Sequence, residues 1–207
     1  MIEVLLKGLV VGVLVAAPVG PIGVLCIKRV LSGGWIIGVA TGLGVASADA
    51  TYGLMVAAGF AATGLLVSFA GPMQIAGGLL IAILGALSLR AFLRPERGNS
   101  RAAPNARGLW GAFASAFGLT LSNPMTILAF AGLVAGLGAA AAGQAGATYV
   151  LVAGVFLGSL LWWVFLSTAT ALARRRLSPG LARWLDLVSG LVLLAWGLRI
   201  AWQALTA

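Results

Sequence analysis

The chain has 207 residues, of which 61% are hydrophobic and 8% are charged, and its mean hydropathy is +1.10. This composition leaves too little polar surface to enclose a water-soluble domain of such length, so it excludes that class and indicates a membrane protein. A formal net charge of +9 suggests a nucleic-acid partner. Most of the basic residues, however, lie in a few short segments between apolar runs, which argues against one.

Six apolar runs are long enough to cross about 30 Å of hydrocarbon as helices. In chain order they are residues 4–27, 35–60, 73–89, 109–135, 147–172 and 184–205. The first run is too long for the apolar part of a signal peptide, so we expect it to stay as the first membrane helix. A polar stretch rich in Arg, Gly and Pro follows the third run. The sequence therefore predicts a three-helix unit at 1–90, a cytoplasmic linker at 91–108 and a second three-helix unit at 109–207.

Eleven of the thirteen basic residues follow the first, third or fifth run. Lys28 and Arg29, for example, are expected in the loop after the first helix. By the positive-inside rule that side is the cytoplasm, which places both termini on the outer side of the membrane. We expect these side chains to be solvated and to contact anionic lipid headgroups.

An odd number of helices in each unit gives the two units inverted topology. Glycines supply a weak indication of a repeat, because the third and sixth runs each carry a pair seven residues apart. These pairs are Gly78 with Gly85 and Gly190 with Gly197. The predicted fold is an all-α integral membrane protein of six transmembrane helices in two inverted three-helix repeats, with helices one and four interrupted.

The interruptions occur at matching depth in the first helix of each unit. They consist of Pro18, Gly20 and Pro21 in one unit and of Asn123 and Pro124 in the other. Proline removes a backbone donor and frees the carbonyl four residues back, and hydrocarbon satisfies neither group. Matched breaks indicate a transporter's central site, because half-helix ends offer partial charges to a solute. We predict that these five residues bind the substrate. For a single proline the alternative is a kink that only shapes packing.

The second run carries small residues at four-residue spacing, which predicts close packing against another helix. They are Gly34, Gly38, Gly42 and Ala46, and the fifth run repeats the pattern with Gly154 and Gly158. Asp49 shares that face and lies near mid-span. A carboxylate at this depth costs at least about 2.5 kcal/mol on insertion scales, so we predict that Asp49 exchanges a proton or meets a cation. The alternative is a neutral Asp that donates an interhelical hydrogen bond.

These residues together resemble the LysE-type amino-acid exporter family, also described as LysE/RhtB-like translocators. The likeness lies in Gly20-Pro21, the basic pair, Gly33-Gly34, Gly38, Gly42, Asp49 and Asn123-Pro124, and in chain length and helix count. It implies proton-driven export of an amino acid or derivative from the bacterial cytoplasm through two inverted three-helix repeats. Family members often have Asn or Gln directly after Gly-Pro, where this chain has Ile22. They often have a basic residue after Asn-Pro, where this chain has Met125. Because Met125 replaces that basic residue and no second mid-membrane acid is present, we expect a neutral or apolar solute rather than lysine.

Other chemistries are disfavoured. With no histidine, one cysteine and one mid-membrane acid, the sequence predicts no metal site, no cofactor and no enzyme. Several hydroxyl residues are expected to make packing hydrogen bonds, namely Ser115, Thr120, Ser122, Ser159 and Thr168. Two other functions stay open. A divalent metal-ion exporter would need several oxygen ligands, and a non-transporting partner subunit would leave Asp49 unexplained. The glycine seams would permit a homodimer.

Overall fold

The structure, a computed structural model, describes residues 1–18, 20–57, 70–93, 108–123, 126, 146–174 and 179–206. These residues form seven helices and no strand: α1 Ile2–Ala16, α2 Pro21–Gly33, α3 Trp35–Ala57, α5 Ala70–Leu93, α6 Gly108–Leu121, α8 Ala147–Arg174 and α9 Pro179–Thr206. The all-helical fold predicted from the sequence is confirmed for them. α1 and α2 together lie over most of the first apolar run, and each other run contributes one of the described helices.

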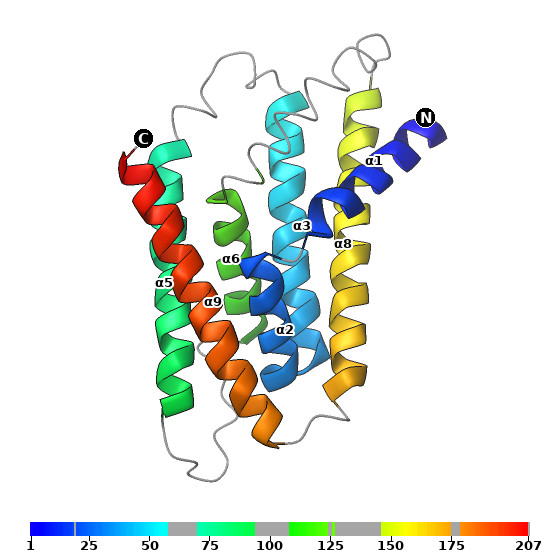
Figure 1. The fold of residues 1–207 in the computed structure, drawn as a ribbon. Helices are drawn as coiled ribbons and strands as arrows, with labels where there is room; N and C mark the ends of the chain where they lie inside the picture. The colour runs from blue at the N-terminus through cyan, green and yellow to red at the C-terminus, as the bar shows by residue number, and fades with distance from the viewer. Residues whose placement is uncertain are drawn as a thin grey trace.

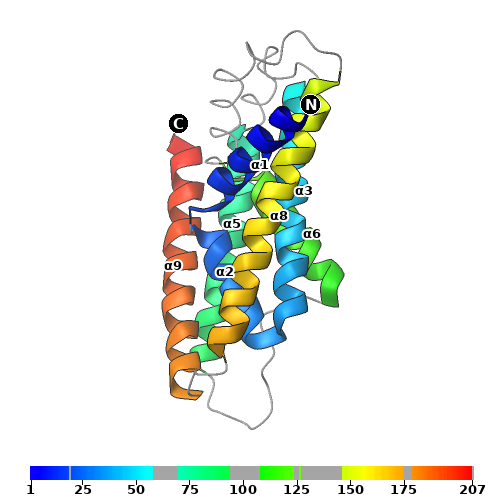
Figure 2. The ribbon, with the colours of Figure 1, turned by 90° about the vertical axis from the view of Figure 1, so that its right-hand side faces the viewer.

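The helices lie side by side in one bundle (Figures 1 and 2). Both termini lie at the same end, which we call the upper end, as in Figure 1. α3, α6 and α9 run toward the upper end, whereas α2, α5 and α8 run away from it. The predicted linker falls mostly on residues outside the described part of the chain, although α5 continues to Leu93 and α6 begins at Gly108.

Two pairs of glycines bring α5 and α9 into close contact. A Cβ atom added to Gly78 would lie 2.8 Å from the carbonyl oxygen of Gly197, and one added to Gly85 would lie 2.9 Å from that of Gly190. Only a residue without a side chain fits such an approach of two backbones. Because Gly78 faces Gly197 and Gly85 faces Gly190, the two helices are antiparallel. The glycine pairs that suggested a repeat in the sequence thus meet each other in the fold.

A second glycine seam joins α1 to α8. A Cβ atom on Gly154 would lie 2.9 Å from the Cα atom of Gly8, and one on Gly158 would lie 2.8 Å from the carbonyl carbon of Leu9. On the other helix, a Cβ atom on Gly12 would lie 2.8 Å from the backbone nitrogen of Ser159. Both seams are filled by helices of the same chain. They therefore do not supply the dimer interface that the sequence permitted.

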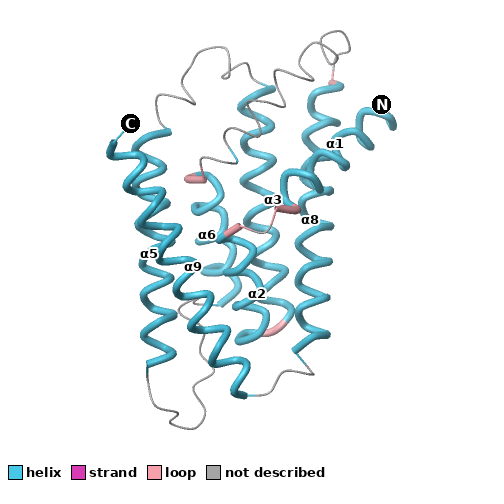
Figure 3. Tube along the Cα trace, viewed as in Figure 1, coloured by secondary structure: helices cyan, strands magenta, loops and turns pink. Residues whose placement is uncertain are grey.

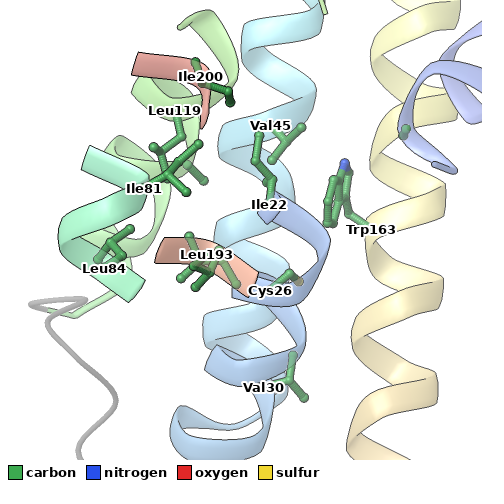
Figure 4. Close-up of a cluster of buried hydrophobic side chains, with 13 residues drawn as sticks. Ile22, Cys26, Val30, Val45, Ile81, Leu84, Leu119, Trp163, Leu193 and Ile200 are labelled. Atoms are coloured by element: carbon green, nitrogen blue, oxygen red, sulfur yellow. The ribbon is translucent and has the colours of Figure 1, made fainter. Parts of the chain in front are cut away.

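α2 lies at the centre of the lower half and packs against α3, α8 and α9. Its buried face carries Leu25, Cys26 and Val30, of which Cys26 and Val30 are fully buried. Figure 4 shows Cys26 between Leu193 of α9 and Trp163 of α8. A helix that begins in mid-bundle is thereby held by apolar contacts on several sides.

The outside of the bundle is apolar, while polar side chains lie inside. α1 exposes one apolar residue per turn, whereas its glycines face inward; the exposed residues are Ile2, Leu6, Val10 and Leu14. Buried polar side chains include Arg29, Thr41, Asp49, Ser159 and Ser167. This distribution is the reverse of that in water-soluble proteins and suits a hydrocarbon surrounding.

Fewer helices qualify as membrane spans when only the length and composition of the described helices are considered. Among the described helices, Ala147–Ala173 alone is long and apolar enough to cross a membrane, and α1 with α2 would form a second span if the bent pair is counted as one. Ile75–Arg90, Gly108–Leu121 and Leu187–Gln203 are apolar but shorter.

The sequence prediction for Lys28 and Arg29 was wrong. Both lie within α2, which continues to Gly33, and they are only 7% and 1% exposed. The helix restarts at Pro21 and extends six residues beyond the end of the predicted run, so it carries the pair into the bundle. Gly34 also differs from its predicted role: with φ of 92° it forms the turn between α2 and α3, a conformation that favours glycine.

The glycine seam can be tested by adding one methyl group. Gly85→Ala places a Cβ atom 2.8 Å from the Cα atom of Leu194, so α5 and α9 must move apart. We expect a loss of about 1–3 kcal/mol in the free energy of unfolding. Gly118→Ala is the matched control, because its Cβ atom would meet nothing within 4 Å and alanine favours a helix by up to about 1 kcal/mol. Thermal unfolding in detergent measures both. Equal midpoints for the two variants would contradict the tight seam.

Candidate functional site

The first interruption separates α1 from α2, whose axes differ by 83° (Figure 3). Pro21 is the first residue of α2, a position where the missing N–H forms no helical bond in any case. Gly20 precedes it with an extended backbone, and its N–H donates to the carbonyl of Pro18 at 2.9 Å. A Cβ atom on Gly20 would meet nothing within 4 Å, so open space adjoins this break.

The second interruption ends α6 at Leu121. The Asn123 N–H donates to the carbonyl of Thr120 at 3.0 Å, and so replaces the bond that a proline at position 124 cannot make. The carbonyl of Leu121 accepts a hydrogen bond from the hydroxyl of Tyr52 on α3. The protein itself therefore satisfies carbonyls that the break would leave exposed to hydrocarbon. Pro124 lies outside the described residues.

Asp49 lies on the inner side of α3 and is 2% exposed. The Ser159 hydroxyl of α8 donates to its Oδ2 atom at 2.7 Å. Among the described side chains, the one ion pair joins Lys7 to Glu3, so no described cation neutralises Asp49. A hydroxyl can donate to a carboxylate or accept from a carboxylic acid, so this partner suits both protonation states.

The Asp49–Ser159 pair lies between two apolar clusters stacked along the bundle. The lower cluster includes Val45 of α3 and Trp163 of α8, and the upper one includes Tyr52 of α3 and Val155 of α8. Asp49 falls between the two clusters along α3, as Ser159 does along α8. Along α3 and α8, apolar side chains thus flank this pair on both sides.

Both helix breaks lie at the same level. In α1, Val15 packs on the upper cluster and Ala16 belongs to the lower one, directly before the first break. In α6, Leu119 belongs to the lower cluster and Leu121 packs on the upper one, directly before the second break. The structure therefore brings the two breaks and Asp49 to one level of the bundle.

The small residues of α3 line the face that carries Asp49. A Cβ atom on Gly38 would lie 2.7 Å from the Ser167 hydroxyl, and one on Gly42 would lie 3.0 Å from the Trp163 ring. Ala46, one turn before Asp49, is fully buried. This face packs against α8, where the predicted glycines Gly154 and Gly158 lie in the α1 seam instead.

Arg29 is the functional candidate that the sequence analysis missed. Its Nη1 atom donates to the Thr41 hydroxyl at 3.2 Å and to the Ala112 carbonyl at 3.1 Å, and its Nη2 atom donates to the Ser115 hydroxyl at 2.7 Å. It therefore ties α2 to α3 and α6. The available signal was the distance from Pro21: a helix that restarts there extends past Arg29, and stops at the glycines that follow.

The described residues contain no group of three or more His, Cys, Asp or Glu side chains able to hold a metal ion. Of the hydroxyls expected to bond between helices, Ser115 and Ser159 do so as described above. Thr168 accepts from the Trp35 indole nitrogen at 3.0 Å.

Comparison with known proteins identifies the family. The model of the LysE type translocator family matches residues 13–204. The chain is also 27% identical over 209 residues to the "Putative amino acid efflux protein YcgF" of Bacillus subtilis (strain 168), with 98% of this chain and 97% of that protein covered. No solved structure matches the chain. The protein belongs to the LysE type translocator family, and it is accordingly a membrane transporter and not an enzyme.

Proposed function

We propose that the protein exports a neutral amino acid, or a similar small zwitterion, across the bacterial inner membrane in exchange for protons. The observation that carries this proposal is the common level of the two helix breaks and the buried Asp49, enclosed by apolar clusters on both sides. The likeness to a protein named for amino acid efflux supports the substrate class. Membrane lipids surround the apolar exterior.

The proposed architecture is two inverted three-helix units, 1–90 and 109–207, joined by the linker 91–108. A two-fold relation between the units would exchange α1 with α6 and α3 with α8. It would turn the α1–α8 contact into the α6–α3 contact, and both contacts are extensive. It would also map the α3–α8 and α5–α9 contacts onto themselves, and these helices do pack together. The packing supports the inverted arrangement.

The solute would bind between the breaks. The N-terminus of α2 offers partial positive charge to a carboxylate, and the open space beside Gly20 gives it room. Asn123 would add an amide contact from the other break, and Asp49 would hold the ammonium group. Pro18, Pro21 and Pro124 would contribute by keeping the backbone out of the helical hydrogen-bond pattern.

Proton exchange at Asp49 would couple export to the proton gradient. When the site faces the periplasm, protonation would neutralise the carboxylate and weaken its hold on the ammonium group, so the solute leaves. When the site faces the cytoplasm, loss of the proton would restore that hold. Ser159 can follow both steps by turning its hydroxyl from donor to acceptor.

The other candidate functions have less support. A divalent metal ion such as Ca²⁺ takes six to eight oxygen ligands, while the described residues contain no group of three or more His, Cys, Asp or Glu side chains that could hold a metal ion. A non-transporting subunit would have no use for a buried carboxylate that costs free energy.

The coupling role of Asp49 predicts a specific defect in Asp49→Asn. The variant keeps the size of the side chain and its hydrogen bond to Ser159, so it should fold. It should still exchange solute for solute, with weaker binding, but it should lose accumulation driven by a pH gradient. Proteoliposomes measure both activities, with counterflow of a panel of amino acids and divalent cations and with an imposed pH gradient.

Ser159→Ala is the complementary control, because it removes the Ser159–Asp49 hydrogen bond, which Asp49→Asn keeps, and leaves the titrating group. It should keep pH-driven transport at a reduced rate. If Asp49→Asn accumulates solute as well as the unaltered protein does, Asp49 is a structural hydrogen-bond donor and the proposed coupling is wrong.

The binding role of the second break predicts that Asn123→Leu abolishes solute binding in a folded protein. Loss of a polar contact to a charged group should weaken binding at least about tenfold. Counterflow and ligand-induced shifts in thermal unfolding measure the loss. Asn105→Leu, in the predicted linker, makes the same chemical change away from the site. Unchanged binding in Asn123→Leu would leave the break as a packing kink.

The proposed topology places residue 100 in the cytoplasm and residue 206 in the periplasm. Cys26 is fully buried, so the unaltered chain should resist thiol reagents and serve as the background. Ser100→Cys should react only when a membrane-impermeant reagent reaches the cytoplasmic face, and Thr206→Cys only from the periplasm. The opposite pattern would overturn the assigned orientation.

A further inference from the structure

Arg29 carries a buried charge that the proposed transport cycle does not yet use. It is 1% exposed, and it stays protonated in proteins. Its three hydrogen-bond acceptors are the hydroxyls of Thr41 and Ser115 and the carbonyl of Ala112, all of them neutral. No described carboxylate lies within ion-pair distance of it. The guanidinium therefore retains its full positive charge within the bundle, as far as the described side chains show.

One edge of the guanidinium is still available to a ligand. The group has five N–H donors, and Nη1 makes two of the three hydrogen bonds and Nη2 makes one. Nε is buried and has no hydrogen-bond partner among the described residues. Nε and Nη2 share one edge of the planar group, and such an edge matches the two oxygens of a carboxylate.

Packing alone does not account for an arginine at this position. An apolar side chain of similar volume can replace a buried ion without loss of stability, and often with a gain. What an apolar residue cannot provide is a fixed positive charge. The anchors on α3 and α6 also hold the guanidinium in one orientation, which lowers the entropy lost when it binds a ligand.

We propose that Arg29 is a second binding station, which receives the carboxylate of the exported solute when the lower end of the bundle opens. This inference rests on the proposed export of a zwitterion. Thr41, which holds Arg29, lies eight residues before Asp49 on α3, and this corresponds to about 12 Å along the helix. The ammonium and carboxylate of one amino acid are much closer together than that. Arg29 and Asp49 therefore act at successive positions of the solute.

Pairs of probes that differ only in the carboxylate test this role. L-leucine and L-alanine are compared with L-leucinamide and L-alaninamide in proteoliposome counterflow. Arg29→Gln should raise the apparent KM for the amino acids about ten- to a hundredfold and change that for the amides less than about threefold. Arg90→Gln removes the same charge from an exposed site near the lower end of α5 and should change neither.

Two further variants separate binding from structure. Ser115→Ala removes one anchor and no charge, so it should raise the KM for amino acids by less than about fivefold. Arg29→Lys keeps the charge but loses the two-donor edge, so it should weaken amino acid binding and spare the amides. If Arg29→Gln fails to fold, the comparison of amino acids with amides can still be made with Arg29→Lys.

The outcomes distinguish this inference from the function on which it rests. If the unaltered protein shows no counterflow of any amino acid, the proposed export function is wrong. If it transports amino acids but the Arg29 variants change acids and amides equally, Arg29 is a structural tie between α2, α3 and α6. That result would overturn the binding station alone.

Discussion

Every backbone group that leaves a helix inside this bundle must find its partner within the protein, because hydrocarbon offers none. α1 ends at Ala16 and α6 ends at Leu121, and the protein supplies partners for backbone groups at these ends. Asn123 serves the carbonyl of Thr120, and Tyr52 reaches from α3 to the carbonyl of Leu121. α2 can start in mid-bundle because α3, α8 and α9 surround it. This requirement explains why the carbonyls of Thr120 and Leu121, at the end of α6, bond to groups of the protein.

Glycine allows the helices to pack closely around these backbone groups, because it has no side chain to fill the space between two helices. The α1–α8 and α5–α9 seams bring backbones so close that a methyl group would collide with the opposite chain. In lipid the hydrophobic effect does not bring helices together, so the dispersion contacts at these seams stabilise their association. The glycines of α1 face the neighbouring helix α8. The long apolar side chains of α1 therefore point to the outside of the bundle. For α1, close packing and the apolar surroundings therefore favour the same rotation of the helix about its axis.

Asp49 and Arg29, the two buried charged residues to which roles are proposed, differ in what they can do. Asp49 can lose its charge by binding a proton, and a hydroxyl accommodates either form. Arg29 cannot lose its charge under ordinary conditions, and three neutral acceptors hold it in place. A titrating group suits a step that must reverse, whereas a fixed charge suits a site that must always attract the same group. Their separation along α3 assigns them to different steps.

The sequence by itself determined the helical class, the approximate position of each described helix, the break between α1 and α2 and the inward position of Asp49. These follow from local rules: run length, proline chemistry and the periodicity of a helix. Tertiary structure decided which helices meet, that the echoed glycines of α5 and α9 face each other, and that Arg29 is enclosed and not solvated. It also paired Asp49 with Ser159, 110 positions along the chain. Contacts across such distances depend on how whole helices pack, and no local pattern of residues encodes that.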